Sequence, residues 1–128
     1  MTHVVGDYEG LNGVRVLVVE DEPALLMDLE LMLAEAGAVV VGLCQTLEEA
    51  LARSDSVDFA VAVLDYQLGD ETVLPLARRL LRRGVPFVLH TGRARSDLSM
   101  AEWSRCPIVE KPTTPRVLIS AVRNVVAR

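Results

Sequence analysis

The sequence predicts an α/β fold: a doubly wound, five-stranded parallel sheet covered by helices on both faces. Short runs of apolar and β-branched residues, typical of strands buried on both faces, alternate with segments that have the apolar spacing of helices. Strands that alternate with helices indicate right-handed βαβ units and therefore a parallel sheet. No linker, repeat or low-complexity tract divides the 128 residues, a length that suits one domain.

The first strand and helix are predicted in residues 14–21 and 22–37. "VRVLVVED" is a short apolar run that ends in acids, as expected of a buried strand. In the next segment Pro23 suits the first turn of a helix and Gly37 is a stop signal. The apolar stripe of this helix consists of Leu25, Leu26, Leu29, Met32, Leu33 and Ala36.

The alternation continues with a strand in 38–44, a helix in 46–54 and a strand in 57–65. "TLEEALARS" opens with a capping box, in which Thr46 accepts from the amide three residues on and Glu49 reaches back. "VDFAVAVLD" has apolar residues on both faces and an acid at its end, which favours a buried strand.

A third helix is predicted in 70–84, where Pro75 is tolerated only in the first turn and Gly84 ends the helix. Its "ARRLLRRG" segment is interpreted as a solvated arginine face, with a docking surface as the alternative. "VPFVLHTG", 85–92, is the fourth strand. Residues 96–105 offer about two helical turns with a weak stripe, and Trp103 is interpreted as a cover over this short helix.

The last strand and helix are predicted in 107–110 and 114–128. In the helix Thr114 is the expected N-cap and Pro115 the first helical residue. Before the first strand, residues 1–13 contain three glycines and little periodicity, so we expect a loose N-terminal arm there and a domain that spans 14–128.

Composition excludes several classes of function. The net charge of −5 argues against direct binding of nucleic acid. No apolar run reaches the roughly 20 residues that span a bilayer, and the N-terminus lacks the pattern of a secretory signal, so we expect a cytoplasmic protein without a membrane partner. The two cysteines lack the spacing of a zinc site and are interpreted as reduced, small hydrophobes.

Polar residues follow the predicted strands where each strand ends. In open α/β sheets ligands bind beyond the carboxyl ends of the strands. Three carboxylates on one edge repel one another by around 4 kcal/mol per close pair at an effective dielectric constant near 20, which calls for a cation among them. The residues at this edge are Glu20 and Asp21 after the first strand, Asp65 after the third, His90 and Thr91 in the fourth, and Glu110 and Lys111 after the fifth.

These residue types form a recognisable chemical set. Mg²⁺ prefers oxygen ligands and is usually held by one or two carboxylates, waters and a phosphate. A carboxylate such as Asp65 can act as a nucleophile toward phosphorus, and a hydroxyl and an ammonium can then neutralise the phosphoryl oxygens. Lys111 is the only lysine beside twelve arginines, and a slim ammonium suits this task better than a guanidinium. His90 is interpreted as a hydrogen-bonded spacer, with an effect on phosphoryl chemistry as the alternative.

With these residues in hand, the chain resembles the receiver domain of two-component response regulators, the chemotaxis-type receiver fold. The motifs are "VLVVEDE", "AVLDYQL", "VLHTG" and "VEKP", in the family's order and at strand ends. The resemblance covers about residues 14–127 and implies the flavodoxin-like strand order 2-1-3-4-5 in a three-layer α/β/α arrangement.

The resemblance also implies roles for individual residues. Asp65 accepts a phosphoryl group from a sensor histidine kinase or phosphotransfer protein. Asp21, Asp65 and the backbone carbonyl of Gln67 bind Mg²⁺, and Glu20 assists through water. Thr91 and Lys111 contact the phosphoryl group, and the Lys111–Pro112 peptide is cis. Gln67 and Arg93 stand where family members tune the loss of the phosphoryl group. The chain is then no enzyme beyond catalysing its own phosphoryl transfer and dephosphorylation, and it signals through contact with a downstream protein or a homodimer.

Three departures from the family pattern concern output. Ile108 stands where a signalling aromatic often lies, three residues before the lysine. Asp65 and Thr91 are 26 positions apart and Thr91 and Lys111 are 20 apart, both shorter than the family norm, so the third and fourth helices should be trimmed. With the "TG" motif, these features are similar to alphaproteobacterial single-domain receivers with an altered fourth helix.

Three alternatives remain open. A haloacid-dehalogenase-type phosphatase needs a second acid two residues after the nucleophile, where this chain has Gln67. A flavodoxin-like cofactor binder needs a phosphate loop after the first strand, where "EDEPA" repels phosphate. The third is a receiver-shaped interaction or phosphate-sink module with little output that depends on phosphorylation.

Overall fold

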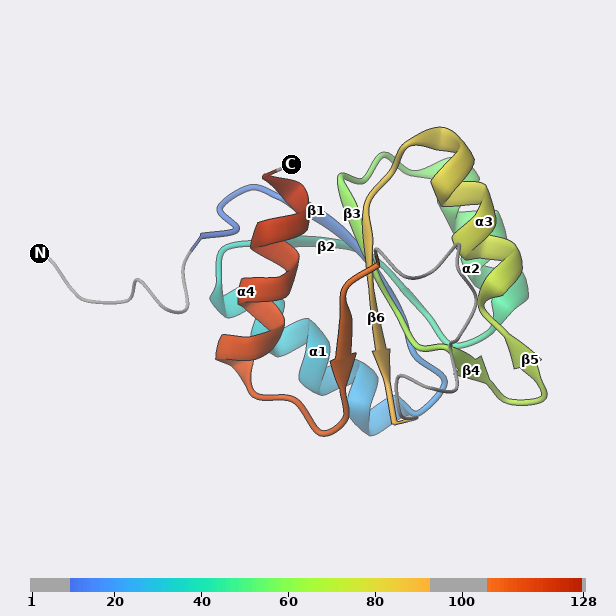
Figure 1. Ribbon diagram of the computed structural model, residues 1–128, viewed down its shortest axis with the longest axis horizontal. Helices are drawn as coiled ribbons and strands as arrows, with labels where there is room; N and C mark the ends of the chain where they lie inside the picture. Colours follow the sequence, from blue (N-terminus) through green and yellow to red (C-terminus); the bar gives the residue numbers. More distant parts are fainter. Residues whose placement is uncertain (1–9, 93–105, 128) are drawn as a thin grey trace, which may run out of the picture.

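A computed structural model of the chain describes residues 10–92 and 106–127, and its main sheet has five parallel strands (Figure 1). The strand order is β2-β1-β3-β6-β7. Counted along the chain among these five strands, this is the predicted order 2-1-3-4-5, so the fold class is confirmed. The strands are β1 (Arg15–Val19), β2 (Val39–Cys44), β3 (Val61–Leu64), β6 (Phe87–Thr91) and β7 (Ile108–Glu110).

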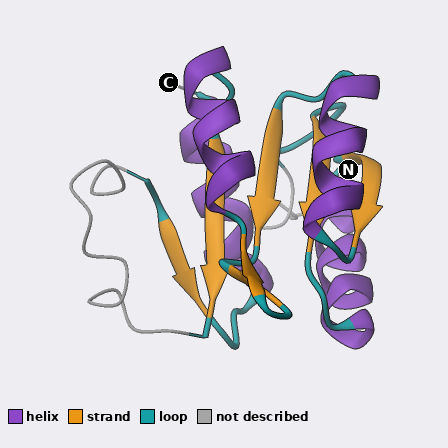
Figure 2. Cartoon of the chain, turned by 90° about the vertical axis from the view of Figure 1, so that its right-hand side faces the viewer, coloured by secondary structure: helices purple, strands orange, loops and turns teal. Residues whose placement is uncertain are grey.

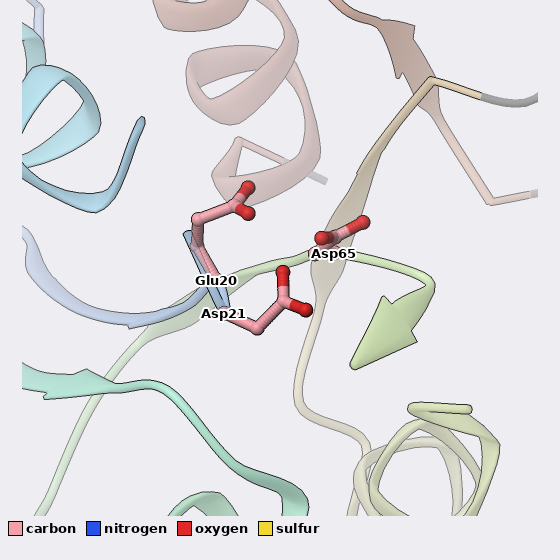
Figure 3. Close-up of side chains that lie close together, drawn as sticks. All are labelled: Glu20, Asp21 and Asp65. Carbon is pink, nitrogen blue, oxygen red and sulfur yellow. The ribbon is translucent and has the colours of Figure 1, made fainter. Parts of the chain in front are cut away.

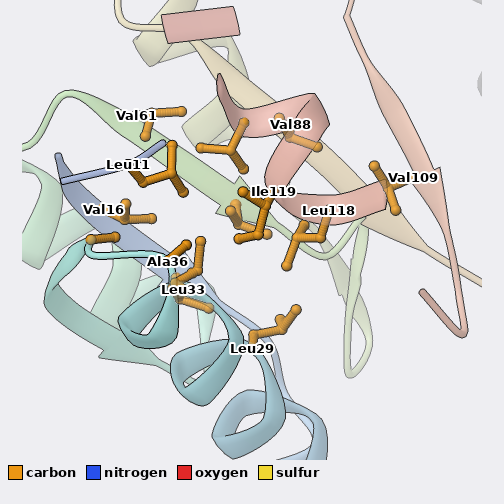
Figure 4. Packing of buried hydrophobic residues seen from close by; sticks show 14 of the residues in the cluster. Leu11, Val16, Leu29, Leu33, Ala36, Val61, Val88, Val109, Leu118 and Ile119 are labelled. Atoms are coloured by element: carbon orange, nitrogen blue, oxygen red, sulfur yellow. The ribbon is translucent and has the colours of Figure 1, made fainter. Parts of the chain in front are cut away.

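Helices cover both faces of the sheet, as Figures 1 and 2 show. One layer contains α1 (Pro23–Glu35) and α4 (Pro115–Val126), and the other contains α2 (Leu47–Ser56) and α3 (Leu74–Arg83). Each layer has its own apolar core, because successive side chains of a strand point to opposite faces of the sheet. The core under α1 and α4 is drawn in Figure 4 and includes Val16, Leu29, Val63, Val88 and Ile119. None of the helices in the described residues is long and apolar enough to cross a membrane.

The domain begins earlier than the sequence predicted. Leu11 is fully buried in the core under α1 and α4. Its amide donates to the carbonyl of Ala36, and the amide of Gly13 donates to the carbonyl of Gly37. The expected arm over 1–13 is therefore wrong for residues 10–13, whose backbone is tied to the end of α1. Residues 1–9 lie outside the described residues.

Both predicted N-cap threonines cap their helices, but Glu49 accepts from a different amide than predicted. Thr46 accepts from the amide of Glu49 at 3.1 Å, and Thr114 accepts from the amide of Val117 at 3.3 Å. The carboxylate of Glu49 accepts from the amide of Gln45 at 2.9 Å, one residue before the amide that a capping box uses. Both threonines thus start their helices, while Glu49 satisfies a neighbouring donor.

The third helix is shorter than predicted, because a small hairpin occupies its expected beginning. Residues before the helix pair as β4 (Gln67–Leu68) and β5 (Glu71–Thr72) in an antiparallel hairpin. The helix begins at Leu74, with Pro75 in its first turn as predicted, and ends at Gly84 in the left-handed conformation. Two-residue strands are below the length that an alternating pattern can reveal.

The arginine face of α3 is partly a helix–helix contact. Arg79 and Arg83 approach the carboxylate of Asp55 at 3.0 and 3.6 Å. Arg83 also donates to the carbonyl of Ser54 at 3.2 Å, near the C-terminus of α2, where cations are favourable. Arg83 is nevertheless exposed, as expected of a solvated face, whereas half-buried Arg79 is part of the contact with α2, so the interpretation is wrong for Arg79 alone. The expected fourth helix in 96–105, with Trp103, and Arg93 lie outside the described residues.

We expect Gly37→Ala to destabilise the protein more than Gly84→Ala. Both glycines have positive φ, 94° and 72°, where an alanine costs roughly 1–2 kcal/mol. At Gly37 an added Cβ would also meet the side chain of Asn12 and lie 3.0 Å from its Cα, whereas at Gly84 nothing lies within 4 Å. Urea unfolding should give losses of about 1 kcal/mol for Gly84→Ala and about 2–3 kcal/mol for Gly37→Ala. Equal losses would show that Asn12 does not pack against Gly37.

Candidate functional site

The candidate site lies at the carboxyl edge of the sheet, where three carboxylates converge (Figure 3). Glu20 and Asp21 follow β1, and Asp65 follows β3. One ligand oxygen from each of the three carboxylates lies within 4.8 Å of the others. Because β1 and β3 are neighbouring parallel strands, their ends meet at this edge, as the sequence predicted.

Backbone hydrogen bonds extend the sheet through the site residues. The amide of Glu20 donates to the carbonyl of Cys44 at 2.9 Å, and the amide of Asp65 donates to the carbonyl of Val19 at 2.9 Å. The amide of Lys111 donates to the carbonyl of Thr91 at 2.8 Å. The positions of these three residues are therefore set by the pairing of the strands before them.

The three carboxylates differ in burial. Glu20 is fully buried, Asp65 is 5% exposed, and Asp21 is exposed. The amide of Glu22 donates to Oε2 of Glu20 at 3.2 Å. The amide of Gly69, in the β4–β5 turn, donates to Oδ2 of Asp21 at 2.9 Å. The pattern of strand ends did not reveal Gly69, although its place four residues after Asp65 in "LGD" marks a turn.

Lys111 links the two buried carboxylates. Its Nζ forms a hydrogen bond with Oδ2 of Asp65 at 3.1 Å and an ion pair with Oε1 of Glu20 at 2.9 Å. Among the described residues Oε1 has no partner in hydrogen-bond geometry, so its contact with Lys111 is an ion pair. The predicted cis peptide between Lys111 and Pro112 is confirmed.

Burial and mutual repulsion make the negative charges of the two buried carboxylates unfavourable. Burial raises the pKa of Glu20 to about 7, against the pairing with Lys111, and the nearby charge of Asp65 adds to the increase. Burial likewise raises the pKa of Asp65. Burial lowers the pKa of Lys111, but its two carboxylate partners outweigh this effect and raise the pKa overall. One ammonium thus faces two buried carboxylates, which titrate as a coupled group.

This group of carboxylates fits a hard divalent cation. Three carboxylates with oxygens within 4.8 Å of one another offer the ligand type that Mg²⁺ prefers, and the two charges of this ion, with that of Lys111, would balance the three carboxylates. Glu20, Asp21 and Asp65 are the described side chains that could hold the ion.

Thr91 and His90 end β6 next to these groups. Thr91 is 1% exposed, and its carbonyl binds the amide of Lys111. His90 is 2% exposed, and neither ring nitrogen has a hydrogen-bond partner in the part of the chain that the structure describes. The interpretation of His90 as a hydrogen-bonded spacer is therefore wrong. Its Nδ1 lies 3.9 Å from Oε1 of Glu20.

The remaining predicted residues lie around this centre. The side-chain amide of Gln67 donates to the carbonyls of Gly69 and Glu71, at 2.9 and 3.2 Å, so it closes the β4–β5 turn. A metal contact from the backbone carbonyl of Gln67 stays a prediction. Ile108 is half-buried and packs against the core under α2 and α3.

Comparison with known proteins adds a family match and a curated relative. A family model described as the response regulator receiver domain matches residues 16–123. The transcriptional regulatory protein AruR of Pseudomonas aeruginosa is 33% identical over 122 residues, which cover 89% of this chain and 50% of AruR. The chain thus spans about half the length of this curated relative.

Solved structures of similar fold include longer chains and chains of matching size. PhyR of Brucella abortus is 25% identical with a TM-score of 0.80, over 95% of this chain and 51% of that chain. SdrG of Sphingomonas melonis Fr1 is 32% identical with a TM-score of 0.77, over 91% of this chain and 98% of that chain. A CheY-like receiver domain protein of Methanospirillum hungatei JF-1 is 25% identical with a TM-score of 0.78, over 91% and 95% of the two chains.

We expect Glu20→Gln to stabilise the metal-free protein at high pH. With a folded-state pKa of about 7 against about 4.5 when unfolded, Glu20 binds more protons in the native state, so its contribution to stability falls as pH rises through this window. Glutamine removes that loss, which is at most about 3 kcal/mol at pH 8. The lowered pKa of His90, about 4, acts in the opposite direction, so the variant must be compared with the native chain at each pH.

The measurement is urea unfolding in a chelator at pH 5 and pH 8, with the exposed Glu35→Gln as the control. The difference between Glu20→Gln and the native chain should grow from pH 5 to pH 8. A difference that is independent of pH would contradict the assignment.

Proposed function

The chain belongs to the family of response regulator receiver domains, and we propose that it accepts a phosphoryl group on Asp65 in a reaction that depends on Mg²⁺. The observation that carries the proposal is the contact of one ammonium, Lys111 Nζ, with the buried carboxylates of both Asp65 and Glu20. The phosphoryl donor is a phosphohistidine on a sensor kinase or phosphotransfer protein. The chain catalyses only its own phosphorylation and dephosphorylation.

Asp65 is the nucleophile in this proposal. A carboxylate oxygen attacks phosphorus, the new O–P bond forms, and the P–N bond to the donor imidazole breaks, so that the imidazole leaves with the electron pair of that bond. Lys111 already contacts Oδ2 of Asp65 and is near enough to pair with the incoming phosphoryl oxygens. The hydroxyl of Thr91 is assigned a hydrogen bond to the phosphoryl group.

The acidic cluster serves the same step. Mg²⁺, when bound, supplies positive charge that neutralises the phosphoryl oxygens. Asp21, Asp65 and the backbone carbonyl of Gln67 are the proposed direct ligands, and Glu20 assists through water. The amide of Gly69 orients the carboxylate of Asp21 for this role. Gln67 and Arg93 are proposed to tune how long the phosphoryl group persists.

Signal output is proposed to proceed by contact with another protein, or through a homodimer. Ile108 packs into the core under α2 and α3, where a signalling aromatic often stands in the family, so an aromatic switch at this position is absent. This feature favours a second candidate, a receiver-shaped interaction or phosphate-sink module with little output that depends on phosphorylation.

We expect one phosphoryl group to be added at Asp65. Incubation of the native chain with Mg²⁺ and acetyl phosphate should give one adduct by intact mass that is stable in acid and labile in base. Asp65→Asn should give none, because the amide is not a nucleophile toward phosphorus. No adduct on the native chain, or an equal adduct on the variant, would refute the assignment.

We expect Asp21→Asn to weaken Mg²⁺ binding at least 10-fold, because one of the proposed ligand carboxylates is lost. Asparagine keeps an oxygen for the amide of Gly69, so the turn should stay in place. Isothermal titration calorimetry measures the affinity, and Asp58→Asn, an exposed residue before β3, is the control for net charge. An equal affinity of both variants would exclude Asp21 as a ligand.

A further inference from the structure

His90 is a buried polar side chain to which the proposed chemistry assigns no role. It lies at the end of β6, 2% exposed, and neither ring nitrogen forms a hydrogen bond in the described residues. Burial and the nearby charge of Lys111 lower its pKa to about 4, so the ring is neutral at pH 7 and carries one donor and one acceptor. Unpaired polar groups are unfavourable in a protein interior, so such a side chain needs a physical explanation.

The ring of His90 lies near Oε1 of Glu20. The two side chains lie on the same face of the sheet, because Val18 and Val88, two residues earlier in each strand, both belong to the core under α1 and α4. Nδ1 of His90 lies 3.9 Å from this oxygen, which also lacks a partner in hydrogen-bond geometry. The ring nitrogen, which has no hydrogen-bond partner in the described residues, therefore lies about 1 Å beyond hydrogen-bond length from an oxygen whose cation is Lys111.

A small cavity lies beside the ring. Its volume is about 80 Å³, enough for about two water molecules. The space allows the ring to shift and can supply water to its second nitrogen. Six of the residues around it are Leu25, Asp28, Leu29, His90, Lys111 and Thr113.

Lys111 cannot serve every acceptor at once. Its Nζ now contacts both Glu20 and Asp65, at 2.9 and 3.1 Å. The ammonium has three donors, and two of them already face these carboxylates. A phosphoryl group on Asp65 brings three further oxygens, so pairing with more than one of them would take the ammonium away from Glu20. The buried Oε1 would then have no cation and no donor within hydrogen-bond length.

We propose that His90 is a positioning residue that donates a ring N–H to Oε1 of Glu20 when Lys111 turns toward the phosphoryl group on Asp65. The inference rests on the proposed function. A shift of about 1 Å converts the 3.9 Å contact into a hydrogen bond, and water in the cavity binds the other ring nitrogen. Glu20 thereby keeps its orientation toward Mg²⁺ while the ammonium is engaged elsewhere.

The test compares His90→Leu with His90→Asn. The two replacements have nearly the same shape, but only asparagine offers an N–H close to the position of Nδ1. Mg²⁺ affinity is measured by calorimetry with and without beryllium fluoride, which mimics the phosphoryl group. Thermal unfolding of the metal-free variants is measured in parallel, because it reports a purely structural role.

We expect His90→Leu to weaken Mg²⁺ binding about 10-fold in the presence of beryllium fluoride and no more than about 3-fold in its absence, a loss typical of groups that orient a metal ligand. His90→Asn should stay within about 3-fold of the native chain in both conditions. The Tm of metal-free His90→Leu should equal or exceed that of the native chain, since two unpaired buried nitrogens are removed.

The outcomes distinguish a failure of the role of His90 from a failure of the proposed function. If His90→Leu binds Mg²⁺ like the native chain with the mimic present, or if both variants are equally weak, the role of His90 is refuted while phosphorylation of Asp65 stands. If the native chain binds neither Mg²⁺ nor beryllium fluoride, the proposed function is refuted and the inference falls with it.

Discussion

The contact of one ammonium with two buried carboxylates is the interaction on which the rest of the site depends. Glu20 and Asp65 lie where an apolar sheet and its helices exclude water, so each negative charge is costly there unless a cation faces it. Lys111 supplies one positive charge for the two, at 2.9 and 3.1 Å. The site thus has fewer positive charges than buried carboxylates, which fits the divalent ion and the phosphoryl group of the proposed function.

Backbone hydrogen bonds of the sheet, rather than contacts between side chains, keep these energetically unfavourable charges in place. The amides of Glu20, Asp65 and Lys111 each donate to a neighbouring strand in the way that a further strand residue would. A slip of one residue in any pairing would send these side chains to the opposite face and bury apolar residues on the wrong side. The free energy that opposes such a slip comes from the two apolar cores. Packing of the cores therefore fixes the strand register and, with it, the geometry of the site.

Strand ends could be predicted from the sequence because parallel strands buried on both faces appear as short apolar runs, and the acids that interrupt them meet at one edge. The burial of Leu11 could not be predicted, since a single leucine among glycines has no periodic signal. The β4–β5 hairpin is too short for any pattern. The pairing of Arg79 with Asp55 joins residues of two helices that are 24 positions apart. The lack of a hydrogen-bond partner for His90 in the described part of the chain depends on distances between strands. These features arise only when the tertiary structure has formed.

The choice of lysine among twelve arginines follows from the same geometry. The carboxylates that Nζ contacts come from two different strand ends, and Lys111 is only 19% exposed at its side chain. An ammonium can exchange one oxygen for another by rotation about its last bonds, because its three donors are equivalent. A guanidinium presents a fixed planar fork that favours two oxygens of one carboxylate, and it would need more room between these strands. The contact with two carboxylates and the proposed exchange of one of them for a phosphoryl group therefore favour a point charge, and this property distinguishes Lys111 from the arginines of the chain.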